Sequence, residues 1–210
     1  FAWQNLRGKT ILGGRKGGMP EMTLEYVMRK NGVIPHEDAT VDTSVQFNMM
    51  AGAFVGGEAD YVALFEPTAT EVELAGQGVV LCSIGEQSGE IPYTAYFAAQ
   101  SYLTENADTV LRFTRAIARG QEWVYAHTDR ELAEAIVGYF PDTSVEVLEK
   151  VAARYKGIRA WKETPDMKQE ALERLETVME QAGELSQRVA YEALVENKFA
   201  YHVMAEMGQK

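Results

Sequence analysis

Residues 13–18 read Gly-Gly-Arg-Lys-Gly-Gly and form the segment best suited to holding a ligand. Glycines allow sharp turns and a close approach of the backbone, and the amide groups at the start of a helix attract electron-rich groups. The segment is not a nucleotide loop, because Met19-Pro20 stands where a phosphate-binding loop needs Lys and Ser/Thr, and G-x-G-x-x-G does not occur. The alternative is a flexible strand-to-helix turn that binds nothing.

The residues around this loop leave the charge of a ligand open. Glu21 in the first turn of the next helix opposes a bare anion, whereas Arg15 and Lys16 favour one. Met19 and Met22 offer adaptable apolar contacts, although methionines at this spacing are more often core residues, Met22 more so than Met19. From this segment we predict ligand contacts by Gly17, Gly18, Met19 and Met22.

Five further residues are candidates for contacts with a ligand: Gln46, Phe47, Phe65, Glu66 and Tyr93. Phe47 is either a stacking wall or the first core residue of its helix. Glu66 either accepts a hydrogen bond from a ligand amine or amide, or caps the helix that follows it. Tyr93 combines an apolar ring with a polar hydroxyl, as suits a cleft.

The side chains needed for catalysis or metal binding are scattered. Cys82 is the only cysteine and lies in an apolar run without a nearby histidine, so a small buried hydrophobe is a better interpretation than a nucleophile. His36, His127 and His202 have no carboxylate or cysteine at metal-ligand spacing, and the G-x-S-x-G pattern of hydrolases is absent. We therefore predict a protein that is not an enzyme and that holds no metal and no cofactor.

The composition narrows the range of partners. The chain has 210 residues and a formal net charge of −11, whereas nucleic-acid-binding surfaces are basic. No run of residues reaches the apolar length that crosses a bilayer. The chain begins at Phe1 and carries no signal peptide, which by itself suggests a cytoplasmic protein or a processed fragment. We expect a small-molecule ligand and no nucleic acid.

The first half of the sequence alternates short apolar runs with amphipathic helices. This alternation predicts an α/β lobe with a parallel sheet covered by helices. Because parallel strands end at one edge of a sheet, the loops that bear the candidate residues should converge there. The predicted strands are 9–12, 39–43, 60–65 and 79–84, and the predicted helices are 19–31, 47–55 and 68–75.

Beyond about residue 100 the sequence predicts helices, with one strand candidate at Tyr93–Ala98. Helices are expected over 104–126 and 167–182, and two more should begin at capping boxes in Thr128–Glu131 and Thr143–Glu146. These helices either form a small bundle or belong to a second sheet whose other strands precede residue 1. The second explanation is favoured, because amphipathic helices behind one crossover strand are typical of half a lobe.

Several segments, taken together in their order and spacing, resemble a known family of binding proteins. The chain is similar to solute-binding proteins of the sulfonate/nitrate/taurine type and to the pyrimidine-binding proteins of thiamine-precursor uptake, the NMT1/THI5-like group. The resemblance covers residues 6–130 and weakens in the helical tail. It is carried by Leu6–Ile11, the glycine turn through Met19, Ala51–Asp60, Phe65-Glu66-Pro67, Ile91–Tyr96 and Tyr102–Asp108.

The resemblance implies a periplasmic-binding-protein type II fold, in which two lobes close on a ligand like a Venus flytrap. One lobe would be residues 8–92, and the other would be residues 93–210 together with roughly a hundred residues before Phe1. The ligand would bind in the interlobe cleft, with hinges near Gly8 and Glu90–Tyr93. The protein would be the extracytoplasmic component of an ABC importer, free or lipid-anchored, monomeric when full length, with the membrane permease as partner.

One departure from the family pattern bears on the choice of ligand. Oxyanion-binding members often place Ser or Thr at the helix start, where this chain has Met19-Pro20-Glu21. The resemblance therefore favours a pyrimidine-like heterocycle, hydrogen-bonded by Glu66, over a sulfonate or taurine. Two alternatives are a pyrimidine-precursor synthase on the same fold, which the lone Cys82 and the scattered histidines disfavour, and a ligand-binding sensor domain.

Overall fold

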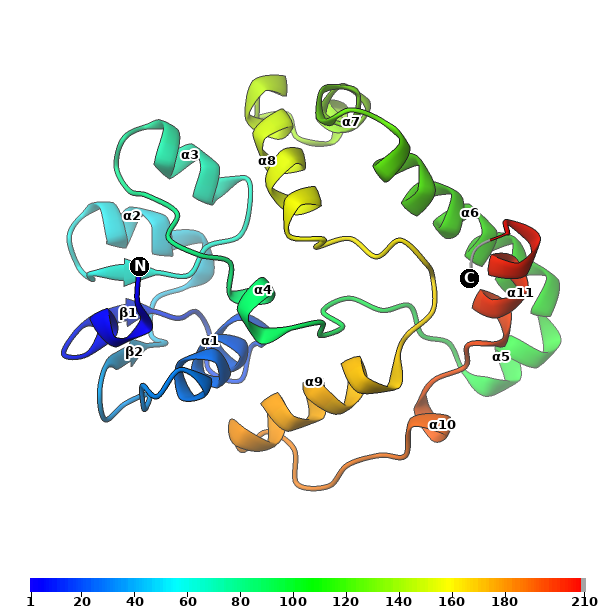
Figure 1. The fold of residues 1–210 in the computed structure, drawn as a ribbon, viewed down its shortest axis with the longest axis horizontal. Helices are drawn as coiled ribbons and strands as arrows, with labels where there is room; N and C mark the ends of the chain where they lie inside the picture. Colours follow the sequence, from blue (N-terminus) through cyan, green and yellow to red (C-terminus); the bar gives the residue numbers. More distant parts are fainter. Residues whose placement is uncertain (209–210) are drawn as a thin grey trace. The chain divides into compact units, whose positions relative to one another are not determined.

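The computed structural model describes residues 1–208, and the chain divides into two compact units (Figure 1). The sheet unit contains residues 1–91 and 174–188, and the helical unit contains residues 92–173 and 189–208. The chain passes from the helical unit back to the sheet unit within α9 (Gln169–Gln181). The lobes expected from the sequence, 8–92 and 93–210, stay a prediction about the complete fold.

Three parallel strands form the centre of the sheet unit. The middle strand β1 (Thr10–Leu12) pairs with β2 (Thr40–Asp42) on one side and with β3 (Tyr61–Val62) on the other. In this register Ile11 lies opposite both Val41 and Tyr61. The protein is therefore of mixed α/β class with a parallel sheet, as the alternating sequence pattern predicts.

Helix α1 (Met19–Lys30) contributes Leu24, Val27 and Met28 to the apolar core that includes the strands. Pro20 occupies the first turn, where its missing N–H costs nothing, and Arg29 and Lys30 occupy the last turn, where cations favour the helix dipole. Its buried face joins one core with the strands and with the short 3-10 helix η1 (Trp3–Leu6). The buried members of this core are Trp3, Leu6, Ile11, Leu24, Val27, Met28, Val33, Ala39 and Val41.

The other elements of the sheet unit are short. They are η2 (Phe47–Met49), α2 (Met50–Val55), α3 (Thr68–Leu74), α4 (Ile84–Ser88) and the carboxyl-terminal part of α9. Helix α4 packs against α1, and Lys30 Nζ donates to the carbonyl oxygen of Gln87 at 2.9 Å. The segment after α9 is tied down by Arg188, which pairs with Glu180.

The predicted fourth strand at residues 79–84 is wrong. Val79 is 75% exposed, and the amide of Val80 donates to Glu73 Oε1 at 3.0 Å instead of to a neighbouring strand. From Ile84 the chain is already helical, in α4. An apolar run of this length indicates burial in general, but it does not supply the partner strand that a sheet needs.

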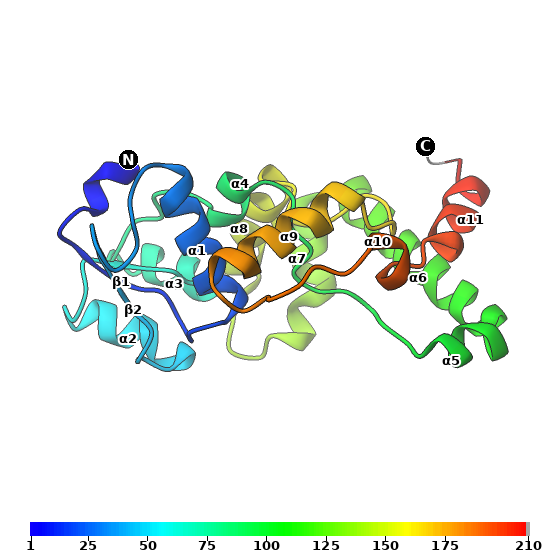
Figure 2. The same cartoon turned by 90° about the horizontal axis from the view of Figure 1, so that it is seen from below.

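The helical unit contains helices only, within the part of the chain that the structure describes. Helices α7 and α8 pack together as a pair, and α11 packs on α6 (Figures 1 and 2). The predicted strand at Tyr93–Ala98 is wrong, because this segment has no regular structure. The elements are α5 (Gln100–Glu105), α6 (Ala107–Ala126), α7 (Asp129–Ile136), η3 (Val137–Tyr139), α8 (Val145–Gly157), α10 (Tyr191–Leu194) and α11 (Lys198–Glu206).

Two helix starts in this unit test the capping predictions. At α7 the capping box is confirmed, since the Thr128 hydroxyl accepts from the Glu131 amide and the Glu131 carboxylate accepts from the Thr128 amide. At α8 the predicted capping box of Thr143 and Glu146 is wrong, because the cap lies one residue later and is a single side-chain bond. Ser144, not Thr143, is the N-cap and accepts from the amide of Val147 at 3.3 Å. Across residues 1–208, none of the helices is both long and apolar enough to cross a membrane.

Candidate ligand-binding site

The carboxyl ends of the three strands bring three loops to one edge of the sheet. The amide of Gly13, after β1, donates to the carbonyl of Asp42 at the end of β2 at 3.0 Å. The amide of Ala63, after β3, donates to the carbonyl of Leu12 at 2.9 Å. These bonds fix the starting points of all three loops, so residues far apart in the sequence emerge side by side.

Two aromatic rings lie together at this edge. The ring centroids of Phe47, after β2, and Phe65, after β3, are 5.2 Å apart with the planes tilted by 43°. Both rings remain accessible, with 43% of Phe47 and 37% of Phe65 exposed. Gly14, at φ 90°, passes beside Phe47, because a Cβ built on it would lie 3.9 Å from Phe47 Cδ2. The three loops thus meet at an exposed aromatic pair.

The glycine turn after β1 has a defined conformation. Gly17 adopts φ 71°, a left-handed conformation that side chains disfavour, and its amide donates to Glu21 Oε2 at 3.1 Å. A Cβ on Gly17 would lie 2.9 Å from Glu184 Oε1, in the turn after α9. The sequence does not predict that Glu184 lies close to Gly17, because no local pattern relates positions so distant along the chain.

The second loop is held at its base by a polar turn. Asp42 Oδ1 accepts from the Ser44 hydroxyl at 2.7 Å and from the Ser44 amide at 2.8 Å. These hydrogen bonds from Ser44 favour the ionised carboxylate and hold the pKa of Asp42 below its usual value. Gln46 is exposed at the N-cap of η2, directly before Phe47. The turn therefore presents Gln46 and Phe47 at the sheet edge.

The remaining predicted residues fall in different surroundings. Glu66 is half-buried and its Oε2 accepts from the Thr70 amide at 2.9 Å, the contact expected of a helix cap. Met22 is buried, as expected if it is a core residue, whereas Met19 and Gly18 are half-buried. Tyr93 is exposed and belongs to the helical unit, whereas the other predicted residues lie in the sheet unit. Their roles toward a ligand stay predictions.

One group of side chains has the composition of a metal site. The ligand atoms of Glu21, Glu25 and His36 all lie within 4.8 Å of one another. The spacing in sequence did not indicate this, because His36 reaches the carboxylates through the turn that follows α1. However, both oxygens of Glu25 already have partners, Arg29 Nη2 at 2.8 Å and His36 Nε2 at 2.7 Å.

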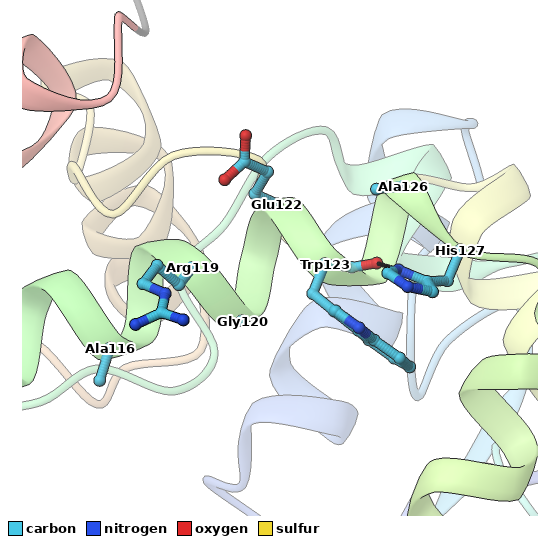
Figure 3. A pocket seen from close by; sticks show the side chains of 7 residues that line it. All are labelled: Ala116, Arg119, Gly120, Glu122, Trp123, Ala126 and His127. Atoms are coloured by element: carbon cyan, nitrogen blue, oxygen red, sulfur yellow. Dashed lines mark hydrogen bonds between the residues drawn. The ribbon is translucent and has the colours of Figure 1, made fainter.

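A hollow lies in the helical unit, along one side of α6 (Figure 3). Its volume is about 540 Å³, and Gly120 leaves room beside Trp123, whose ring stacks on His127 with centroids 4.0 Å apart. Because the wall comes from one helix and the residue after it, side chains do not converge on this hollow from several elements, as they do in a binding pocket. The lining residues are Ala116, Arg119, Gly120, Glu122, Trp123, Ala126 and His127.

Comparison with known proteins places this arrangement in a family. A family model described as NMT1/THI5 like matches residues 2–131. The chain belongs to the NMT1/THI5-like family. The chain is also 42% identical over 206 residues to a protein of Bacillus subtilis (strain 168) that bears the name "Putative binding protein YtlA". The matched region covers 98% of this chain and 62% of the length of that relative.

The region that matches the NMT1/THI5-like family contains the sheet and the candidate site. It includes the three strands, the glycine turn and the aromatic pair of Phe47 and Phe65, and it ends inside α7. The family resemblance seen in the sequence is therefore confirmed, and it rests on the part of the chain in which the sheet edge is formed.

Proposed function

We propose that this chain acts in solute binding, as part of the extracytoplasmic component of an ABC importer that captures a small organic molecule and passes it to a membrane permease. The proposal is supported by membership of the NMT1/THI5-like family and by the similarity to a Bacillus subtilis protein named as a binding protein. A type II binding-protein fold, with the present sheet unit as one wall of the site, is part of the same proposal.

The observation that carries the proposal is the exposed aromatic pair at the carboxyl edge of the sheet. Phe47 and Phe65 lie 5.2 Å apart on loops whose bases are each hydrogen-bonded to the end of the central strand β1 or the glycine after it. Accessible aromatic faces beside a glycine turn suit a flat, apolar ring, which gains stacking energy that a tetrahedral sulfonate lacks. We therefore infer that the ligand is a planar heterocycle of the pyrimidine kind, with a sulfonate such as taurine as the competing class.

Binding without chemistry is the second part of the proposal. Cys82 is half-buried, and its desolvation raises the pKa of the thiol, so the reactive thiolate is disfavoured. Its partial burial against the core of the sheet unit fits a packing role. A synthase of the same family would need an activated group at the site, and Cys82 does not have that character.

Isothermal titration calorimetry of the protein tests the class of ligand. An aminopyrimidine precursor of thiamine should give a binding heat, and taurine and methanesulfonate should give none. Replacing Phe65→Ala should weaken the pyrimidine by about 2- to 10-fold, the loss of one aromatic contact. The matched control Tyr139→Ala removes an exposed ring of the helical unit and should leave the affinity unchanged. Tight binding of taurine without pyrimidine heat would overturn the assignment.

A further inference from the structure

Two carboxyl groups are buried together beneath the glycine turn. Glu21 and Glu25 lie four residues apart on α1, and each is only 4% exposed. Their oxygens lie within 4.8 Å of one another and of His36 Nε2. Like charges at this distance in a buried place repel, so the pair is costly when both carboxyls are ionised.

The partners of the two carboxyl groups differ. Glu25 is compensated, because Arg29 Nη2 donates to its Oε2 at 2.8 Å and His36 Nε2 lies 2.7 Å from its Oε1. Glu21 instead has the Gly17 amide, which donates to its Oε2 at 3.1 Å. Glu25 therefore has two side-chain partners, whereas Glu21 has a backbone amide donor that belongs to the candidate site.

The protonation of Glu21 follows from these surroundings. Burial raises its pKa most, and the neighbouring charge of Glu25 raises it further. A protonated Glu21 also donates a hydrogen bond to Glu25, which again favours the protonated form. The Gly17 amide and the charge of His36 act in the opposite direction, and the net pKa of Glu21 lies above its usual value.

We propose that Glu21 and Glu25 share one proton and that this proton controls the conformation of the Gly17–Gly18 turn. When the proton is present, Glu21 is held toward Glu25 by a hydrogen bond. When it leaves, the two carboxylates repel, Glu21 moves away from Glu25, and the turn moves with it because the Gly17 amide is bonded to Glu21. The turn and the buried pair are therefore one unit, because the same Glu21 carboxyl bonds to both.

This proton also regulates ligand binding at the candidate site. Only this effect on ligand binding rests on the proposed function. With Glu21 neutral, the start of α1 carries one negative charge fewer and accepts an electron-rich ligand group more readily. Other charged groups near the turn are Glu184, close to Gly17 from the turn after α9, and the exposed Arg15 and Lys16. Glu184 is exposed, so its charge is screened by solvent and acts less strongly than that of the buried Glu25.

A shared proton fits the geometry better than a divalent cation. A cation bound by Glu21, Glu25 and His36 would displace at least one of the two bonds that Glu25 already makes. It would also lie close to the guanidinium group of Arg29, which repels it. A metal therefore requires rearrangement of the cluster, whereas a proton requires none.

The proposal is tested on the free protein by following the Gly17 amide in nitrogen-15 NMR spectra between about pH 4 and about pH 9. The Gly17 signal should titrate with a midpoint above that of an ordinary glutamate. Glu21→Gln should abolish the titration, and Glu25→Gln should lower the midpoint, because the neighbouring charge is gone. The control Glu58→Gln removes an exposed carboxylate elsewhere in the sheet unit and should change neither.

A second measurement does not depend on NMR signals. Because the folded state holds the proton of Glu21 more tightly than the unfolded state does, this group contributes stability that is fully present at low pH. The contribution is lost as the pH rises from the ordinary glutamate range through the raised pKa of Glu21. Urea denaturation of wild-type protein should show this decline with pH, and Glu21→Gln should remove it.

The shared proton would be contradicted if the chemical shift of the Gly17 amide did not change with pH, or if Glu25→Gln left the titration midpoint unchanged. It would also be contradicted if stoichiometric zinc shifted the midpoint, since that would make the cluster a metal site. No ligand is used in these measurements. A protein that fails to bind pyrimidines in calorimetry can therefore still pass this test, and the two failures are distinguished.

Discussion

Helices α1 and α6 are both amphipathic, but only α1 has a fully buried apolar face. In α1, Leu24 is 3% exposed and Val27 and Met28 are completely buried against the strands. In the much longer α6, Ala118 is buried, whereas Phe113 is 45% exposed although it contacts Tyr96. Both helices repeat apolar residues at helical spacing, so the difference lies in the surface that covers each one.

The comparison shows what helical periodicity can and cannot indicate. Helix α1 lies on a parallel sheet, a broad apolar surface, whereas α6 packs on the short helix α11. Since hydrophobic stabilisation grows with the apolar area removed from water, the same pattern contributes more in α1 than in α6. Periodicity therefore predicts which face is apolar, but not how much of it becomes buried.

The largest effect that tests this comparison is the loss of a core side chain. Met28→Ala should lower the free energy of unfolding by about 2–5 kcal/mol, because it leaves a cavity in the core of the sheet unit. Phe113→Ala removes a larger side chain from α6 but should cost less than about 1.5 kcal/mol, since the ring is half exposed and loses chiefly its contact with Tyr96. Urea denaturation measures both values.

Equal costs for the two variants would contradict the comparison, because they would mean that α6 is as well covered as α1. Leu148→Ala is the matched control inside the helical unit. Leu148 is 1% exposed in α8, beside α7, and should cost about as much as Met28. This control separates a weakly covered helix from a unit that is weakly packed throughout.

Local signals account for the parts of the fold that were predicted. Helix α1 was expected over 19–31 and runs over Met19–Lys30, because Pro20 and Gly32 mark its two ends. The three observed strands lie within predicted strands, and their parallel order follows from the helices between them. The run at residues 79–84 was mispredicted, because a strand also needs a neighbour, and that is not a local property.

The candidate site also has parts that the sequence predicts and parts that depend on long-range packing. The convergence of the glycine turn with Phe47 and Phe65 follows from topology, since parallel strands end at one edge. The approach of His36 to Glu25 depends on the turn after α1, where His36 takes φ 65°, a conformation rare outside glycine. The approach of Glu184 to Gly17 depends on the packing of distant segments, and no sequence pattern indicates it.

A smaller effect compares one glycine from each unit. At Gly13 a Cβ would lie 2.6 Å from Val41 Cγ1, so Gly13→Ala should push β1 and β2 apart and cost about 1–3 kcal/mol. At Gly120, in α6, a Cβ would meet no heavy atom within 4 Å, so Gly120→Ala should stabilise the protein by about 0.5–1 kcal/mol through its helix propensity. Thermal unfolding should show opposite shifts of the melting temperature for the two variants. A lower melting temperature for Gly120→Ala would contradict the comparison, because it would mean that other residues cover this side of α6 closely.

The smallest effect concerns the ends of helices. We expect helix capping to matter more in the helical unit than in the sheet unit, because no sheet within residues 1–208 covers its helices. Ser144→Ala should cost about 0.5–2 kcal/mol, because the Val147 amide at the start of α8 loses its acceptor. Thr143→Ala, one residue earlier, is the matched control and should cost less, since Thr143 is not the N-cap. Urea denaturation of both variants decides between the two registers of the cap. A larger cost at Thr143 would restore the capping box expected from Thr143 and Glu146, and would mean that the local sequence signal, rather than the observed helix start, is correct.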